Sequence, residues 1–352
     1  MAAVTHSERR RTWLRATLAL LLAAAFAAPG HLLDAGRGAS SLLGDADRGS
    51  AFDDKGASSL RLGDKDRGHR STEGWPVRGQ GAYVLGNGRP AASPHQRPVP
   101  IASVAKVMTA YVVLRHYPLG AGESGRRFVV GQRDVVDTAA RRSTGQSIVD
   151  VRAGERLTER QALMAILLPS ANNVAALVAR QVSGSVASFV AEMNRTARAL
   201  GMSHTTYTDP SGYDAGTVST ALDQLRLARV VARDQTLAAM MATRHYWLPV
   251  AGEVTNTNAL LGHDGFVGMK TGSDQAAGGC LMFRVVWPTA SGNRSLIGVV
   301  LGQRGGNLLT AGLYAAKQLA DRLAPSAAPG TYRRHIENRI RAGNPPLPSM
   351  GR

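Results

Sequence analysis

A serine and a lysine three residues apart are the first groups in this 352-residue chain whose types and spacing could do chemistry. Ser103 and Lys106 open the apolar stretch 101–114, and residues at i and i+3 share one face of a helix. A buried lysine is costly unless it is paired or loses its proton, and a neutral amine can take the proton of a hydroxyl. The pair therefore predicts a serine nucleophile with its base. The alternative for an isolated pair is a helix cap at Ser103 and a Lys106 side chain that reaches solvent.

The choice of cation supports the first interpretation. Of the 42 lysine and arginine residues only five are lysine, at positions 55, 65, 106, 270 and 317. Arginine cannot lose its proton in a protein, so a lysine at 106 or 270 indicates a position where an amine that titrates is wanted.

Two further polar segments have spacings that suit a site. Ser170 and Asn172 stand in a short break between two apolar helical runs and can face one cavity, although either could instead be a helix N-cap. Lys270, Thr271 and Gly272 end a strand-like run, where lysine and threonine could hold a carboxylate. A glycine at a strand edge lets another backbone approach, and an exposed edge can bind an extended peptide.

The elements that must position these groups are mixed in type. Period-two patterns predict strands, period-3.6 patterns predict helices, and Thr158 with Gln161 forms a capping box. The strands are expected at 81–85, 266–272, 279–287 and 295–301, and the helices at 101–114, 158–168, 187–200, 219–232 and 308–323, with a further apolar helical period around 174–178. Strands before and after a helical block predict an α+β fold, an antiparallel sheet with helices packed on it.

Both ends of the chain differ from this middle part. Residues 1–28 read as an export signal, with Arg9 to Arg15 as its positive region and Ala25-Phe-Ala27 as a cleavage site; an uncleaved signal anchor is the alternative. Residues 29–75 contain a tandem polar repeat and predict a disordered linker, 76–325 the folded domain, and 326–352 a loose basic tail. We therefore expect an exported protein of the periplasm or extracytoplasmic envelope, with no stable membrane span after signal cleavage.

Taken in order, the three motifs carry a resemblance. Ser103-x-x-Lys106, Ser170-x-Asn172 and Lys270-Thr-Gly272 match the triplet of serine penicillin-recognising enzymes. The resemblance extends to the residues around these motifs, at 100–109, 168–173, 199–202 and 268–280. Over residues 82–323 the chain resembles the D-alanyl-D-alanine carboxypeptidases, the low-molecular-mass penicillin-binding proteins. The resemblance implies a β-lactamase/transpeptidase-like fold, in which an antiparallel sheet is flanked by helices and joined by a mainly helical subdomain.

The resemblance also implies catalytic roles. Ser103 would be the acyl-ester nucleophile, Lys106 its general base, and Ser170 the relay that returns the proton to the leaving amine. The backbone N–H groups of Ser103 and Ser273 would form the oxyanion hole.

The remaining implied roles are in substrate binding. Asn172 would hold the substrate amide, and Lys270 and Thr271 the terminal carboxylate, beside Gly272 and Ser273. Asp274, next to this carboxylate pocket, is a negative charge that the resemblance leaves unexplained.

The activity so implied is a serine D-Ala-D-Ala carboxypeptidase that acts on peptidoglycan stem peptides in cell-wall synthesis and remodelling, with β-lactams as covalent inhibitors. It needs no metal or cofactor, and the sequence has no clustered ligand spacing that would supply one. The few residues after Pro325 resemble shorter members that act as DD-endopeptidases on cross-links, so the bond that is cut stays open.

The sequence also bears on three other classes of protein. A class A β-lactamase needs a glutamate four residues before an asparagine, but Glu192 and Glu253 are followed at that spacing by threonines. A non-catalytic penicillin sensor would keep Ser103 and Lys106, and the residues leave it open. The net charge of +17 suits an anionic partner, but 5% aromatic residues and an export signal argue against nucleic acid. Cys280 is the only cysteine and is expected to pack in a strand. His263 is expected in a turn, and a position lining the cleft is the alternative.

Overall fold

The computed structural model of the chain describes residues 74–290 and 292–324. The predicted export signal, the basic tail and all but the last two residues of the predicted linker lie outside the described residues. Those three assignments stay predictions, and the fold below is that of the domain expected at 76–325.

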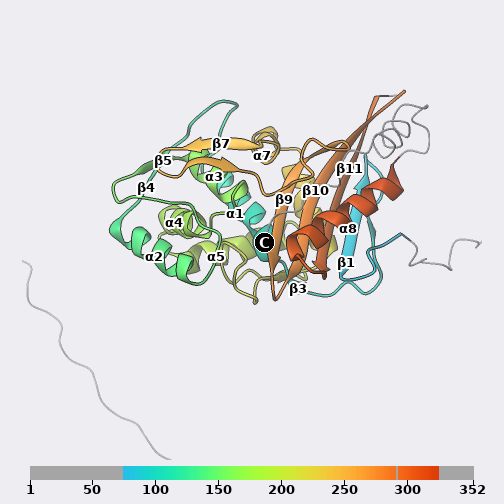
Figure 1. Ribbon diagram of the computed structural model, residues 1–352, viewed down its shortest axis with the longest axis horizontal. Helices are drawn as coiled ribbons and strands as arrows, with labels where there is room; N and C mark the ends of the chain where they lie inside the picture. The colour runs from blue at the N-terminus through green and yellow to red at the C-terminus, as the bar shows by residue number, and fades with distance from the viewer. Residues whose placement is uncertain (1–73, 291, 325–352) are drawn as a thin grey trace, which may run out of the picture. The chain divides into compact units, whose positions relative to one another are not determined.

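The domain contains a five-stranded antiparallel sheet (Figure 1). Its order is β2-β1-β11-β10-β9, with β1 at Gln80–Leu85, β2 at Ala91–Ala92, β9 at Phe266–Asp274, β10 at Gly278–Thr289 and β11 at Gly292–Gln303. Among the described residues the strand β9 pairs with β10 alone, so its other edge is open to a further strand.

The two faces of the sheet are covered by different apolar clusters. The helix α8 (Leu308–Leu323) packs on one face, where Leu313 and Leu319 join Phe266 and Phe283. The other face belongs to a larger core that also contains buried residues from the helices between residues 106 and 241. Strand residues alternate between the two clusters, with Leu281 and Phe283 in the first and Met282 in the second, as the pleat of a strand requires.

The helical part lies on the β9 side of the sheet (Figure 1). A 3₁₀ turn η1 (Ala102–Ala105) leads into the buried helix α1 (Lys106–His116). Around it are α2 (Gln132–Ser143), α3 (Glu159–Leu167), α4 (Asn172–Ser183), α5 (Val186–Ala199), α6 (Ala221–Val231) and α7 (Gln235–Met241). Three short strand pairs complete it: β3 (Val99–Pro100) with β6 (Val218–Ser219), β4 (Arg127–Val129) with β5 (Arg156–Thr158), and β7 (His245–Leu248) with β8 (Gly252–Thr255).

The predicted α+β class is confirmed, and so are the main predicted strands and helices within a few residues of their ends. The capping box of Thr158 and Gln161 is present, with both reciprocal hydrogen bonds. One boundary was wrong: the helix expected from residue 101 begins at Lys106, because the residues before it form the 3₁₀ turn.

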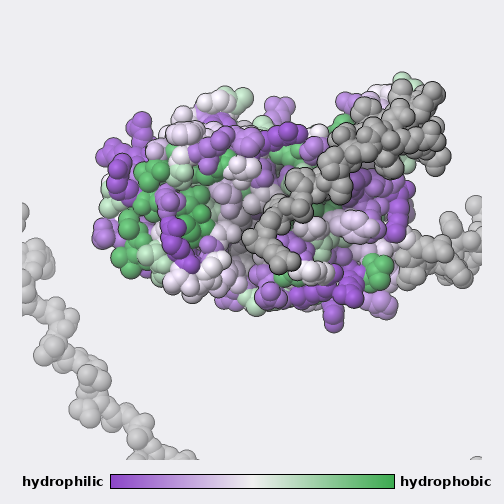
Figure 2. All heavy atoms as spheres, in the orientation of Figure 1, coloured by the Kyte–Doolittle hydropathy of each residue, from purple (hydrophilic) through white to green (hydrophobic). Residues whose placement is uncertain are grey.

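Within residues 74–290 and 292–324, no single helix is long and apolar enough to cross a membrane, whereas α4 and α5 reach that length and composition only as a pair bent by 86°. On the face in Figure 2, hydrophobic residues gather over the helical part near α2 and α4, and hydrophilic residues cover most of the rest.

Candidate active site

The predicted nucleophile lies in a strained turn at the centre of the domain. Ser103 belongs to η1, and the residue before it, Ala102, has φ +46°, a backbone conformation that non-glycine residues adopt only when their surroundings hold them there. Lys106 follows as the first residue of α1, with no exposed surface. Its Nζ lies 2.8 Å from Ser103 Oγ and donates over the same distance to the carbonyl of Ser211.

The electrostatics of this turn favour a neutral amine. Burial lowers the pKa of Lys106 well below its ordinary 10.5, the charge of Lys270 lowers it further, and Asp209 opposes the shift. Ser103 caps neither η1 nor α1, and Lys106 does not reach solvent. The alternative of a plain cap with a solvent-directed lysine is therefore wrong.

A loop that the sequence did not single out holds the second partner of Lys106. Asp209 accepts hydrogen bonds from the backbone of Ser211 and Gly212 and from the hydroxyl of Thr217. A Cβ on Gly212 would lie 1.9 Å from the carbonyl oxygen of Ala102, and its φ is +77°. Only glycine allows this loop to pack against the serine turn. The signal that could have found it is the turn composition Asp209-Pro-Ser-Gly212.

Ser170 and Asn172 lie in the predicted break between α3 and α4, and both are buried. Ser170 has φ +68°, and its Oγ has no hydrogen-bond partner among the described residues. The amide of Asn172 donates to Gln146 Oε1 at 2.9 Å, while its Oδ1 has no described partner. The N-cap of α4 is Ala171, so neither side chain serves as a cap. Buried polar atoms are rarely left unpaired, which marks Ser170 Oγ and Asn172 Oδ1 as candidate contacts for a substrate.

The open strand β9 lies directly against the serine turn. A Cβ on Gly272 would be 2.9 Å from the backbone nitrogens of both Ser103 and Val104, so a side chain there would push the strand away. Lys270 is buried, donates to the Thr271 carbonyl at 3.0 Å, and has its pKa lowered by burial to about 7.

A hydrogen-bonded bridge joins β9 to the Ser170 segment. The hydroxyls of Thr271 and Thr257 lie 2.5 Å apart, and the Thr257 N–H donates to the carbonyl of Leu168, two residues before Ser170. The structure thus brings Ser103, Lys106 and Gly272 close together. It also links the segment of Lys270 and Thr271 to the segment of Ser170 through Thr257, a residue that the sequence analysis did not identify.

The remaining predicted residues have simpler places. Ser273 is exposed and pairs with Gly279 in the sheet. Asp274 accepts the N–H of Ala277 at 2.7 Å, which gives the unexplained carboxylate a structural role in closing the turn between β9 and β10. Cys280 is buried, as expected, and burial raises its pKa to about 12.

Residues 91–305 match the family model of peptidase family S11, described as D-alanyl-D-alanine carboxypeptidase. The chain belongs to this family.

Among similar proteins, the D-alanyl-D-alanine endopeptidase of Pseudomonas aeruginosa is 34% identical over 222 residues, 58% of this chain and 63% of that protein. The D-alanyl-D-alanine endopeptidase of Escherichia coli is 30% identical over 198 residues, 53% of this chain and 59% of that protein. The chain thus covers less than two thirds of each of these two relatives.

A solved structure shows the same fold. The DD-transpeptidase of Streptomyces K15 aligns with a TM-score of 0.60 and 24% identity, over 70% of this chain and 97% of that one. The domain therefore has the transpeptidase-like fold that the sequence motifs implied.

Proposed function

We propose that the chain is a serine-type D-Ala-D-Ala carboxypeptidase that acts on peptidoglycan stem peptides through an acyl-enzyme on Ser103. The observation that carries the proposal is the 2.8 Å contact between Ser103 Oγ and a fully buried Lys106 whose pKa is lowered, beside the open edge of β9. Membership of the S11 family supports the same reaction.

Acylation follows from these contacts. The neutral amine of Lys106 takes the Ser103 proton, and Oγ attacks the carbonyl carbon of the penultimate D-alanine. The backbone N–H groups of Ser103 and Ser273 are the proposed donors to the oxyanion. The proton passes through Ser170 to the leaving nitrogen, the C–N bond breaks, and D-alanine departs. Water then attacks the ester, with Lys106 again as base, and the shortened peptide leaves.

Substrate binding uses the rest of the site. The peptide lies along the open edge of β9 as an added strand, and the amide of Asn172 contacts its backbone. Lys270 and Thr271 hold the terminal carboxylate, whose negative charge favours the protonated form of a lysine with a pKa near 7.

The same machinery could cut a cross-link instead of a terminal residue. Two similar proteins bear the name D-alanyl-D-alanine endopeptidase, and this alternative needs only a larger leaving group at the same serine. We propose an extracytoplasmic location for either activity, because the substrate lies there and because residues 1–28 read as an export signal.

Digestion of purified muropeptides separates these activities. Mass spectrometry of products should show free D-alanine and monomers shortened by one residue for a carboxypeptidase, or split dimers for an endopeptidase. Covalent labelling by a penicillin without either product would instead indicate a penicillin sensor.

A further inference from the structure

A cleft with a basic lining lies at the end of the sheet where β9 turns into β10. Its volume is about 520 Å³, and the residues around it include Arg78, His95, Arg97, Pro100, Ala276 and Arg304. Three arginines line it, and its described lining contains no aspartate or glutamate. This volume is within the range of small-ligand sites, and three guanidinium groups in a lining without carboxylates favour an anion. Asp274, in the adjoining turn, has one carboxylate oxygen on the N–H of the lining residue Ala277.

The walls of the cleft are held by buried contacts. Gln80, only 4% exposed, donates to the Arg97 carbonyl at 2.7 Å and accepts the N–H of Ala221 at 3.1 Å, so the Arg97 backbone is fixed to β1 and to the start of α6. At the turn between β9 and β10 the Arg304 guanidinium donates to the carbonyls of Gln275 and Ala276 at 2.7 and 2.9 Å. These contacts fix the backbone of Arg97 and the guanidinium of Arg304, whereas the side chains of Arg78 and Arg97 are exposed.

The cleft also continues the path of the proposed substrate. Pro100 precedes Ser103 by three residues, and Ala276 follows the end of β9 by two. If Lys270 holds the carboxyl terminus of a peptide on β9, the rest of that peptide extends past Ser273 toward Ala276. Three residues of strand span about 10 Å, so the second residue of a pentapeptide whose end is held at Lys270 lies opposite Ser273, three residues before Ala276 at the cleft.

We infer that this cleft is an anion subsite that binds a free carboxylate of the stem peptide upstream of its D-Ala-D-Ala end. The inference rests on the proposed function for the identity of the peptide. Arg97 and Arg78 are its main contacts, because neither makes an ion pair with a described residue, whereas the Arg304 guanidinium is engaged by two carbonyls.

The test measures binding alone, in a Ser103→Ala background that cannot form the acyl-enzyme. Two pentapeptides ending in D-Ala-D-Ala are compared by calorimetry; they differ only at the second residue, which carries a free carboxylate in one and an amide in the other. Arg97→Gln should weaken the acidic peptide about fivefold and leave the amidated peptide unchanged, and Arg97→Lys should retain part of the affinity. Arg78→Gln should act in the same direction.

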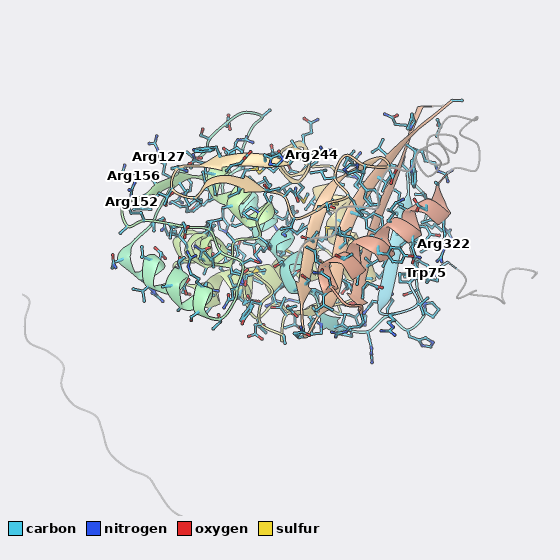
Figure 3. All side chains as sticks on the ribbon, viewed as in Figure 1. Trp75, Arg127, Arg152, Arg156, Arg244 and Arg322 are labelled. Carbon is cyan, nitrogen blue, oxygen red and sulfur yellow. The ribbon has the colours of Figure 1, made fainter. Side chains whose placement is uncertain are left out.

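The matched control is Arg127→Gln on β4, an exposed arginine without an ion pair in the described part of the chain. Figure 3 shows Arg127 beside Arg152 and Arg156, at the end of the helical part away from the sheet. It should change neither affinity. Equal affinities of the two peptides for the parent, or an equal loss of both in Arg97→Gln, would overturn the subsite. Release of D-alanine by the protein with Ser103 intact tests the proposed function separately.

Discussion

Replacing Lys270 by methionine should stabilise the domain while impairing its proposed activity. The side chain is 1% exposed, and burial lowers its pKa from 10.5 to about 7. A shift of this size corresponds to about 5 kcal/mol, the cost at pH 7 of burying an amine that the unfolded chain keeps protonated. Methionine removes that cost and keeps a similar length, so Lys270→Met should raise the free energy of unfolding at pH 7 by up to about 5 kcal/mol.

The gain should depend on pH with a definite sign. Between pH 7 and 10.5 the unfolded chain holds a proton on Lys270 that the folded chain has released, so the stability of the parent rises with pH. The advantage of Lys270→Met should therefore fall to about 2 kcal/mol at pH 9 and vanish near the ordinary lysine pKa.

Urea denaturation at pH 7 and pH 9, followed by circular dichroism, measures both values. The matched control is Lys317→Met on α8, where a partly exposed amine lies 2.9 Å from Asp321 and 3.1 Å from Asp264; it should lose up to about 1 kcal/mol. No stabilisation at pH 7, or a gain that is the same at both pH values, would refute the view that Lys270 is held at a desolvation cost.

Three further outcomes are expected. Lys106→Arg keeps the charge but cannot accept the serine proton, so acylation by a fluorescent penicillin should slow about a hundredfold or more; an unchanged rate would remove Lys106 as the base. In the parent, acylation should accelerate as pH rises through the lowered pKa of Lys106. Lys270→Met removes a nearby positive charge, so this acceleration should occur at a higher pH in the variant. Stopped-flow labelling from pH 5 to 10 measures both profiles, and identical profiles would show that the two amines do not interact. Gly212→Ala places a Cβ 1.9 Å from the Ala102 carbonyl oxygen and should lower the free energy of unfolding by at least about 3 kcal/mol. The control Gly145→Ala has a similar φ and open space around the Cβ, so it should lose about 1 kcal/mol. Equal melting temperatures for the two variants would contradict the close packing of the loop.

The sequence predicted the parts of the fold that have strong periodic signals. The long strands β9 to β11 are runs of mostly buried apolar residues, and the helix α8 buries one face through Leu313, Ala316 and Leu319. Thr158 with Gln161 marks the start of α3. The helix α2 was missed because it lies on the surface and buries only Asp134 and Thr138, so it has no apolar stripe. The pairs β4–β5 and β7–β8 were missed because runs of three or four residues are too short to show a period.

The site was partly predictable for a similar reason. Ser103 with Lys106 is a local pair, so its spacing is visible in the sequence. The contact of Lys106 with Ser211 joins residues 105 positions apart, and the bridge from Thr271 through Thr257 to Leu168 joins three separate segments. Such contacts come from tertiary packing, which no local pattern encodes. The 3₁₀ turn at Ser103 has the same origin, because it packs against Gly272 of β9 and Gly212 of the Asp209 loop.

The central claim is that a buried, neutral lysine makes Ser103 a nucleophile for acyl transfer. Incubation with benzylpenicillin, followed by mass spectrometry of the intact protein and of its proteolytic peptides, tests it most directly. The account predicts one adduct per chain, located on Ser103 and absent from Ser103→Ala. An adduct on another residue, or equal labelling of the Ser103→Ala variant, would contradict it.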